Sequence, residues 1–246
     1  MHAPYGPGAV LMLVCVAAQA EPIWVGKFLP SAEGLPPPWK VEQLNKDIPP
    51  TSYKAREWDG VQAIEAHAVK SMALLARSLE VDLARTPILC WRWRIDAPLK
   101  RADMKTKAGD DYAARVYLSF TVPPESLGLG TRMALGLARS MRGNSVPDAA
   151  VNYIWDNRHD IGTWQANAYT ERARMLVLRS GATDAGRWVD ERRDVSADFL
   201  KAFGHAPAKL TGLAIASDTD NTGEEAHAGF ADFHFVAANE ACAASR

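Results

Sequence analysis

The sequence lacks the charge imbalance that binding to nucleic acid or to an anionic membrane requires. Among 246 residues, 28 lysines and arginines stand against 29 aspartates and glutamates, so the formal net charge is −1 at pH 7. A chain without a basic excess has no electrostatic footprint for a polyanion. The content of 48% hydrophobic and 23% charged residues is ordinary for a globular protein and argues against disorder.

Signatures of the common catalytic machineries are also missing. The chain contains no G-x-S-x-G nucleophile elbow, H-E-x-x-H zinc motif, phosphate-binding P-loop or dinucleotide fingerprint. It also lacks the E-x-D-x-x-E pattern with which jelly-roll glycosidases supply paired carboxylates. The six histidines show no metal-ligand spacing. We therefore expect no organic cofactor and assign no catalytic residue.

Long hydrophobic runs are absent, with one short exception near the start. The ten residues Ala9–Ala18 are apolar, which is too short to span a bilayer comfortably, and Ala18-Gln19-Ala20 matches an A-x-A cleavage pattern. We expect residues 1–20 to be a signal peptide and residues 21–246 to form one domain without an integral membrane segment. The leading residues contain no lysine or arginine, so an uncleaved buried helix is the alternative. Export predicts a periplasmic or secreted protein.

Cysteine is scarce as well. Removal of the first twenty residues leaves only Cys90 and Cys242. The two residues can pair in an oxidising compartment, but cysteines this far apart form no recognisable disulfide framework. We expect two free thiols, with a single disulfide as the alternative.

Alternation of apolar and polar residues runs through most of the chain and is typical of β-strands. The segment Ile88–Ile95 shows it most clearly, and the whole chain is expected to contain ten or more short strands. Two segments interrupt the pattern. One is Glu125–Arg142, and the other is an expected helix that has Ser196 as its N-cap and stops at Gly204. This arrangement predicts an all-β fold, an antiparallel β-sandwich of jelly-roll type with two short helical inserts.

The stretch Lys105–Phe120 is the best indication of a working surface. Read as a strand, it has one apolar face made of Tyr112, Ala114, Val116, Leu118 and Phe120. The opposite face carries Asp111, Arg115 and Tyr117. Asp111 and Arg115 would lie about 13 Å apart in an extended strand. Each would therefore need a partner on another strand or on a ligand.

Two interpretations of this polar face remain open. It forms either a groove for a hydroxyl-rich ligand or a cross-strand charge ladder on a solvated sheet. Aromatic rings can stack on sugars, so a tryptophan in a polar setting is a candidate platform, although core packing is its alternative role. The predicted ligand-binding residues are Asp110, Asp111, Arg115, Tyr117, Asn152 and Trp155.

The loop Asp218–Gly223 resembles the first half of a calcium-binding loop, with oxygen donors at positions one, three and five and glycine at six. Position twelve is Gly229 where an EF-hand needs glutamate, which excludes an EF-hand. A looser calcium site made by Asp218, Asp220 and Asp232 is the remaining metal hypothesis. Its alternative is a turn whose side chains bond their own backbone.

Several motifs that occur in order resemble one bacterial family, catalogued as domain of unknown function 3047. The motifs are WRWRI, TKAGDDYAARVYLSF, VNYIWDN, RMLVLRSG, RWVDERRDVSADFLKAFG and GLAIASDTDNTG. They extend from about Trp91 to Phe235. The resemblance implies an exported or envelope-associated protein, and it supplies no catalytic residues.

These observations favour a non-catalytic binding module for a glycan or another ligand of the cell envelope. One alternative is a polysaccharide-acting hydrolase or lyase that uses Asp110, Asp111, Arg115 and Tyr117. The other is a structural envelope protein that binds calcium.

Overall fold

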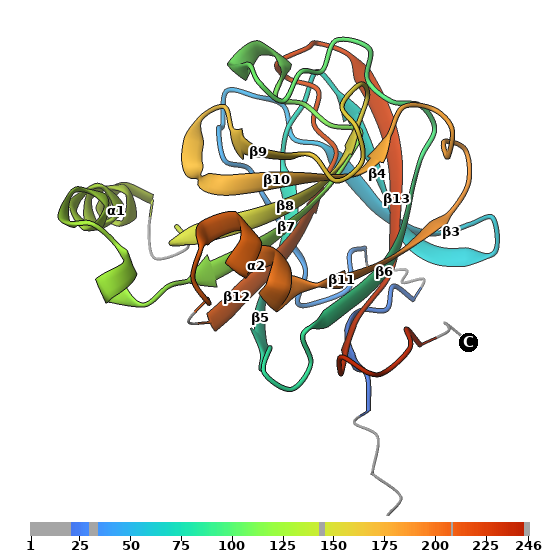
Figure 1. The fold of residues 1–246 in the computed structure, drawn as a ribbon. Helices are drawn as coiled ribbons and strands as arrows, with labels where there is room; N and C mark the ends of the chain where they lie inside the picture. Colours follow the sequence, from blue (N-terminus) through green and yellow to red (C-terminus); the bar gives the residue numbers. More distant parts are fainter. Residues whose placement is uncertain (1–20, 30–33, 143–145, 208, 244–246) are drawn as a thin grey trace, which may run out of the picture.

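The chain forms two β-sheets packed face to face, with two α-helices at the periphery (Figure 1). The computed structural model describes residues 21–29, 34–142, 146–207 and 209–243. The predicted all-β sandwich is confirmed, whereas the predicted signal peptide lies outside the described residues. Within the described ranges, no helix combines the length and the apolar character that crossing a membrane would need.

Sheet A has the strand order β11-β6-β13-β4-β3, and β1 also pairs with β13. All of its described pairs are antiparallel. Its strands are β1 (Ile23–Gly26), β3 (Ser52–Trp58), β4 (Val61–Val69), β6 (Ile88–Ile95), β11 (Val189–Asp194) and β13 (Glu225–Val236). The Asp59-Gly60 turn closes the β3–β4 hairpin, with both residues at positive φ.

Sheet B has the order β2-β5-β12-β7-β8-β10-β9. Its strands are β2 (Lys40–Glu42), β5 (Leu74–Val81), β7 (Ala114–Thr121), β8 (Ala149–Asp156), β9 (Trp164–Asn167), β10 (Thr170–Ser180) and β12 (Lys209–Ala216). One pair departs from the antiparallel prediction, because β10 runs parallel to β8. The chain leaves β8, turns back as β9 at the sheet edge, and returns as β10 into the gap between them.

The two helical inserts are α1 (Leu129–Arg142) and α2 (Val195–Phe203). Helix α2 begins before the predicted cap, because Asp194 is the N-cap and its side chain accepts a backbone hydrogen bond of 2.9 Å from the first turn. Gly204 ends the helix as predicted, with a φ of 77° that suits glycine.

The core lies between the sheets and is rich in aromatic side chains. Trp91 of β6 stacks on Tyr153 of β8 and on Phe233 of β13, with centroid separations of 5.3 and 6.2 Å. All three side chains are buried. Full burial of a large apolar side chain contributes about 1.5–3 kcal/mol. This stack therefore couples the two sheets.

Cys90 and Cys242 form a disulfide, so the expectation of two free thiols is wrong. Their Cα atoms lie 5.8 Å apart although 152 positions separate them in the sequence. His234 secures the same segment, since its Nε2 accepts the Ala243 N–H at 2.8 Å while its Nδ1 lies 2.6 Å from the Asp232 carbonyl oxygen. Sequence distance hid this pairing, because only the fold brings the segment after β13 to β6.

We expect Cys242→Ser to lower the free energy of unfolding by about 2–5 kcal/mol, since a cross-link over a long loop restricts the unfolded chain. Urea unfolding followed by circular dichroism measures the change. Wild type in reductant is the control and should unfold like the variant. Identical midpoints for the oxidised wild type and Cys242→Ser would contradict the expectation.

Candidate functional site

A buried guanidinium organises the outer side of sheet B. Arg115 of β7 points away from the core, yet it is only 3% exposed, because the segments before β7 and after β12 fold over it. Its Nη1 donates to Asp218 at 2.9 Å and its Nη2 donates to Asp110 at 3.1 Å. The rings of Tyr112 and Tyr117 lie 4.5 and 4.8 Å from its Cζ atom. Two carboxylates and two aromatic rings therefore enclose the guanidinium.

The contact between Asp110 and Arg115 depends on a strand that starts later than its sequence pattern indicates. A 3₁₀ turn occupies Lys107–Gly109, and β7 begins only at Ala114. The residues between them are not extended in a strand, so Asp110 can fold back onto Arg115. Tyr112 also leaves the predicted apolar face, and it packs instead into a smaller apolar cluster outside the main core.

Asp111 lies beside this pair in a second set of carboxylates. Its side chain is fully buried, and its Oδ2 accepts the Thr222 N–H at 2.6 Å. Carboxylate oxygens of Asp111, Asp218 and Asp220 lie within 4.8 Å of one another. Among the described residues, Oδ1 of Asp111, Oδ1 of Asp218 and Oγ1 of Thr222 are buried without a hydrogen-bond partner. Unpaired buried oxygens are costly, and here they occur on Asp111, on Asp218 and on Thr222, whose backbone N–H donates to Asp111.

The cluster holds more negative than positive groups, with four carboxyls around one guanidinium. Burial raises the pKa of Asp218, and Asp111 and Asp110 raise it further against the opposing effect of Arg115. Burial alone would lower the pKa of Arg115, but Asp110 and its other acidic neighbours hold that pKa well above its ordinary value. The arginine therefore stays charged, and full ionisation of every carboxyl would need a further cation.

The remaining predicted ligand-binding residues form no open groove. Tyr117 is half-buried beside Arg115, and Asn152, opposite it on β8, is fully buried. Trp155 turns into the core with 2% exposure, and its Nε1 donates to the Gly181 carbonyl at 3.0 Å. Its ring offers no free face for stacking, so the core-packing alternative describes Trp155.

Asp232 lies away from the two other predicted metal ligands. It belongs to β13 of sheet A, where its carboxylate is 3.6 Å from Arg92. Asp218 and Asp220 instead follow β12 of sheet B. Asp232 lies at a bulge in β13, where its φ is 61° and the register against β6 shifts between Ala231 and His234. Asp111 occupies the place beside Asp218 and Asp220 that we assigned to Asp232.

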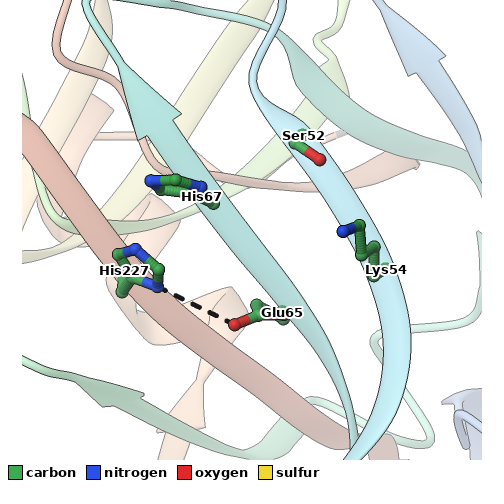
Figure 2. Close-up of a pocket in the computed structure, with 5 residues that line it drawn as sticks. All are labelled: Ser52, Lys54, Glu65, His67 and His227. Atoms are coloured by element: carbon green, nitrogen blue, oxygen red, sulfur yellow. Dashed lines mark ion pairs between the residues drawn. The ribbon is translucent and has the colours of Figure 1, made fainter.

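A second polar site, which sequence analysis missed, lies on the outer face of sheet A (Figure 2). A pocket of about 230 Å³ is lined by Ser52, Lys54, Glu65, His67 and His227. The antiparallel register of β4 and β13 places the two histidines directly opposite each other, with ring centroids 3.9 Å apart. Spacing along the chain could not show this pair. The available signal was the placement of polar residues at every second position of each strand.

The same outer face carries two indoles beyond the polar pocket. Trp58 and Trp188 are half-buried and meet edge to face at 6.3 Å, and Nε1 of Trp188 donates to the Trp58 carbonyl at 2.9 Å. Gly229 permits the close approach of Trp188, because a Cβ atom there would lie 2.7 Å from the ring. The Arg94 guanidinium lies 4.2 Å from the Trp58 centroid. One sheet face thus combines aromatic rings with a polar pocket.

Comparison with known proteins places the chain in a family. Residues 37–234 match the family model described as "Protein of unknown function (DUF3047)". The chain belongs to this family. The resemblance inferred from its motifs is therefore confirmed, and no curated protein matches this DUF3047 member.

The solved structures that match include the xyloglucanase domain of NopAA, a type three effector from Sinorhizobium fredii, in complex with cellobiose. The alignment covers 81% of this chain and 98% of that chain, with 10% sequence identity and a TM-score of 0.35. A likeness of this degree carries no argument about function. The function of this DUF3047 protein is therefore argued from its own residues.

For this DUF3047 protein we expect Arg115→Met to lower the free energy of unfolding by about 3–5 kcal/mol at neutral pH, because Asp110 and Asp218 would lose a buried counter-charge. Urea unfolding measures the loss. Arg56→Met is the matched control, since Arg56 pairs with Glu65 at 3.2 Å on an exposed strand and should change stability by less than about 1 kcal/mol. If both substitutions lowered the free energy of unfolding by the same amount, the buried pairs of Arg115 would contribute no more to stability than the exposed Arg56–Glu65 pair.

Proposed function

We propose that this protein is an exported, non-catalytic binding module of the cell envelope that binds a glycan along the outer face of sheet A. One observation carries the proposal. The β3, β4 and β13 strands present a pocket of hydrogen-bonding side chains, and two half-buried indoles, Trp58 of β3 and Trp188 directly before β11, lie on the same accessible sheet face.

This combination matches what sugar recognition requires. Apolar faces of sugar rings pack against indoles, and a few placed polar groups hydrogen-bond the hydroxyls. Ser52, Lys54, Arg56 and Trp58 alternate along β3 and project to the same side, with Trp58 at the far end from the pocket. Ser52 to Trp58 spans about 20 Å at the usual rise per residue, which suits an oligosaccharide better than a single sugar.

The contrast with sheet B supports binding over catalysis. The carboxylates first considered for a polysaccharide-acting enzyme, Asp110 and Asp111, are 7% and 0% exposed. Asp110 is engaged by Arg115 and by Asn167, whose Nδ2 donates to it at 2.7 Å. A polysaccharide would have to displace the covering segments before it reached these groups.

Export is part of the proposal and has two supports. The A-x-A pattern at Ala18–Ala20 is one. The Cys90–Cys242 disulfide is the other, because structural disulfides persist in oxidising compartments and are rare in reducing ones.

We expect Trp58→Ala to weaken glycan binding about tenfold or more, since loss of one aromatic contact costs up to about 1.5 kcal/mol beyond its buried area. A glycan array identifies the probe, and isothermal titration calorimetry with that oligosaccharide measures the affinity. Tyr169→Ala is the matched control, because Tyr169 is 56% exposed and lies beside β9 and β10 of sheet B. A glycan whose affinity depends on Tyr169 and not on Trp58 would refute binding at the outer face of sheet A. An array on which no glycan binds would refute the proposal that the ligand is a glycan.

We also propose a structural calcium ion in the sheet B cluster, because its carboxylates lie within 4.8 Å of one another and two of them, Asp111 and Asp218, each have a buried oxygen without a hydrogen-bond partner. Calcium takes six to eight oxygen ligands and tolerates irregular geometry. Asp111, Asp218, Asp220 and Thr222 would supply side-chain oxygens, and the ion would balance the negative excess around Arg115. The ion would hold the segment after β12 against the segment before β7.

We expect calcium to raise the melting temperature of chelator-treated protein, with a stabilisation of about 2.7 kcal/mol when its concentration is 100 times its dissociation constant. Asp220→Asn should abolish the shift, and its half-buried position keeps the risk of misfolding low. Asp232→Asn is the control and should retain the shift, because asparagine tolerates the left-handed backbone at that position. A melting temperature that neither calcium nor chelator changes would dispose of this ion.

A further inference from the structure

The facing histidines of the sheet A pocket, His67 and His227, have a carboxylate neighbour whose oxygen lies near the Nε2 atoms of both rings. Glu225, at the start of β13, places its Oε1 2.8 Å from the His67 Nε2 and 3.7 Å from the His227 Nε2. One ligand atom from each of the three residues lies within 4.8 Å of the others. We propose that His67, His227 and Glu225 form a binding site for a divalent transition-metal ion of the zinc class.

The separations fit the coordination geometry of such an ion. Bonds of about 2.0–2.2 Å from zinc to histidine nitrogen and carboxylate oxygen place neighbouring ligand atoms of a tetrahedral site about 3.3 Å apart. The two measured separations, 2.8 and 3.7 Å, lie on either side of that value. One nitrogen of each histidine lies within 4.8 Å of the other, so side-chain rotations that bring these two atoms closer would complete the site.

The second nitrogen of His227 is directed in the way that metal-bound histidines require. Its Nδ1 lies 3.7 Å from the Glu65 Oε1, and Figure 2 shows this contact across β4 and β13. This separation is longer than a hydrogen bond, so a small side-chain rotation must close it before the carboxylate can favour the tautomer with a proton on Nδ1 and leave the Nε2 lone pair for a metal. Arg56 in turn holds the same Glu65 oxygen at 3.2 Å. Glu65 would thus be a positioning residue that does not touch the ion.

The donor set selects the class of ion. Two imidazole nitrogens and one carboxylate suit zinc, copper, nickel or iron, whereas calcium and magnesium prefer all-oxygen sites. The site also has room for a further ligand, because His67 and His227 line the pocket that Ser52 and Lys54 also border. Three protein ligands with an open position is the arrangement in which a bound metal contacts water or an external ligand.

A plain cross-strand histidine pair on a solvated sheet is the alternative explanation. That alternative accounts for the proximity of His67 and His227 through register alone. Register also places Glu65 and Glu225 beside the pair, since each lies two positions from a histidine on its own strand. It does not by itself direct the Nε2 atoms of both rings toward one carboxylate oxygen, as they are here. The proposal does not depend on glycan binding, and its test contains no glycan.

Isothermal titration of the full mature chain with ZnCl₂, after removal of any affinity tag, tests the site. We expect one zinc ion per chain, and visible d–d absorption typical of tetrahedral coordination when Co²⁺ replaces zinc. His67→Gln and His227→Gln should each abolish measurable binding. Glu65→Gln should weaken binding by about 10–100-fold, as loss of a carboxylate behind a ligating histidine usually does.

His205→Gln is the matched control, because this histidine lies between α2 and β12 and outside the pocket. The zinc affinity of the His205→Gln variant should equal that of the wild type. Circular dichroism melts without metal establish that the variants fold, which an exposed sheet surface should permit. Zinc binding that survives the double substitution of His67 and His227, or a wild type that binds no zinc, would overturn the proposal.

Discussion

The charge of Arg115 is the constraint on which the loops of sheet B depend. A guanidinium that is 3% exposed needs carboxylates beside it, because an unpaired charge away from water costs several kcal/mol. The chain supplies Asp110 from the segment before β7 and Asp218 from the segment after β12. Asn167 of β9 joins them through Asp110. One buried cation thereby fixes three segments that are remote in sequence over the same sheet face.

The segments that cover the outer face of sheet B determine where a ligand can approach the protein. The polar side chains around Arg115 on the outer face of sheet B are buried beneath covering segments, whereas Ser52, Lys54 and Arg56 on the outer face of sheet A are exposed. On sheet A the register of β3, β4 and β13 arranges small and polar residues in rows, and Gly229 leaves space for the Trp188 ring. The same sandwich thus has one covered polar face and one accessible polar face.

Sequence periodicity was sufficient to predict most strands and helices, but it could not predict which of them contact each other over long distances in the sequence. Alternation correctly predicted a strand over Ile88–Ile95, and its period of two places Trp91 and Trp93 together on the buried face of β6. It failed before β7, where a 3₁₀ turn breaks the period and moves Asp110 onto Arg115.

The disulfide and the His67–His227 pair depend on strands far apart in the chain, which no local pattern encodes. The parallel placement of β10 against β8 has the same cause. The residue types along each strand therefore predicted which face of the strand is polar. Which residues contact each other could be known only from the order of the strands in the sheets.

The position of β13 has a consequence for how the protein reaches its native state. Although β13 is the last strand in sequence, it lies in the interior of sheet A, between β6 and β4, and it also carries β1 (Figure 1). Until β13 arrives, the β3–β4 hairpin and the β6–β11 pair each expose an unpaired edge. Such non-local pairing slows folding and prolongs the exposure of aggregation-prone strands. An unfolded or newly synthesised chain would therefore depend on a late closing event, and a partner that shields strand edges would have its greatest effect before that event.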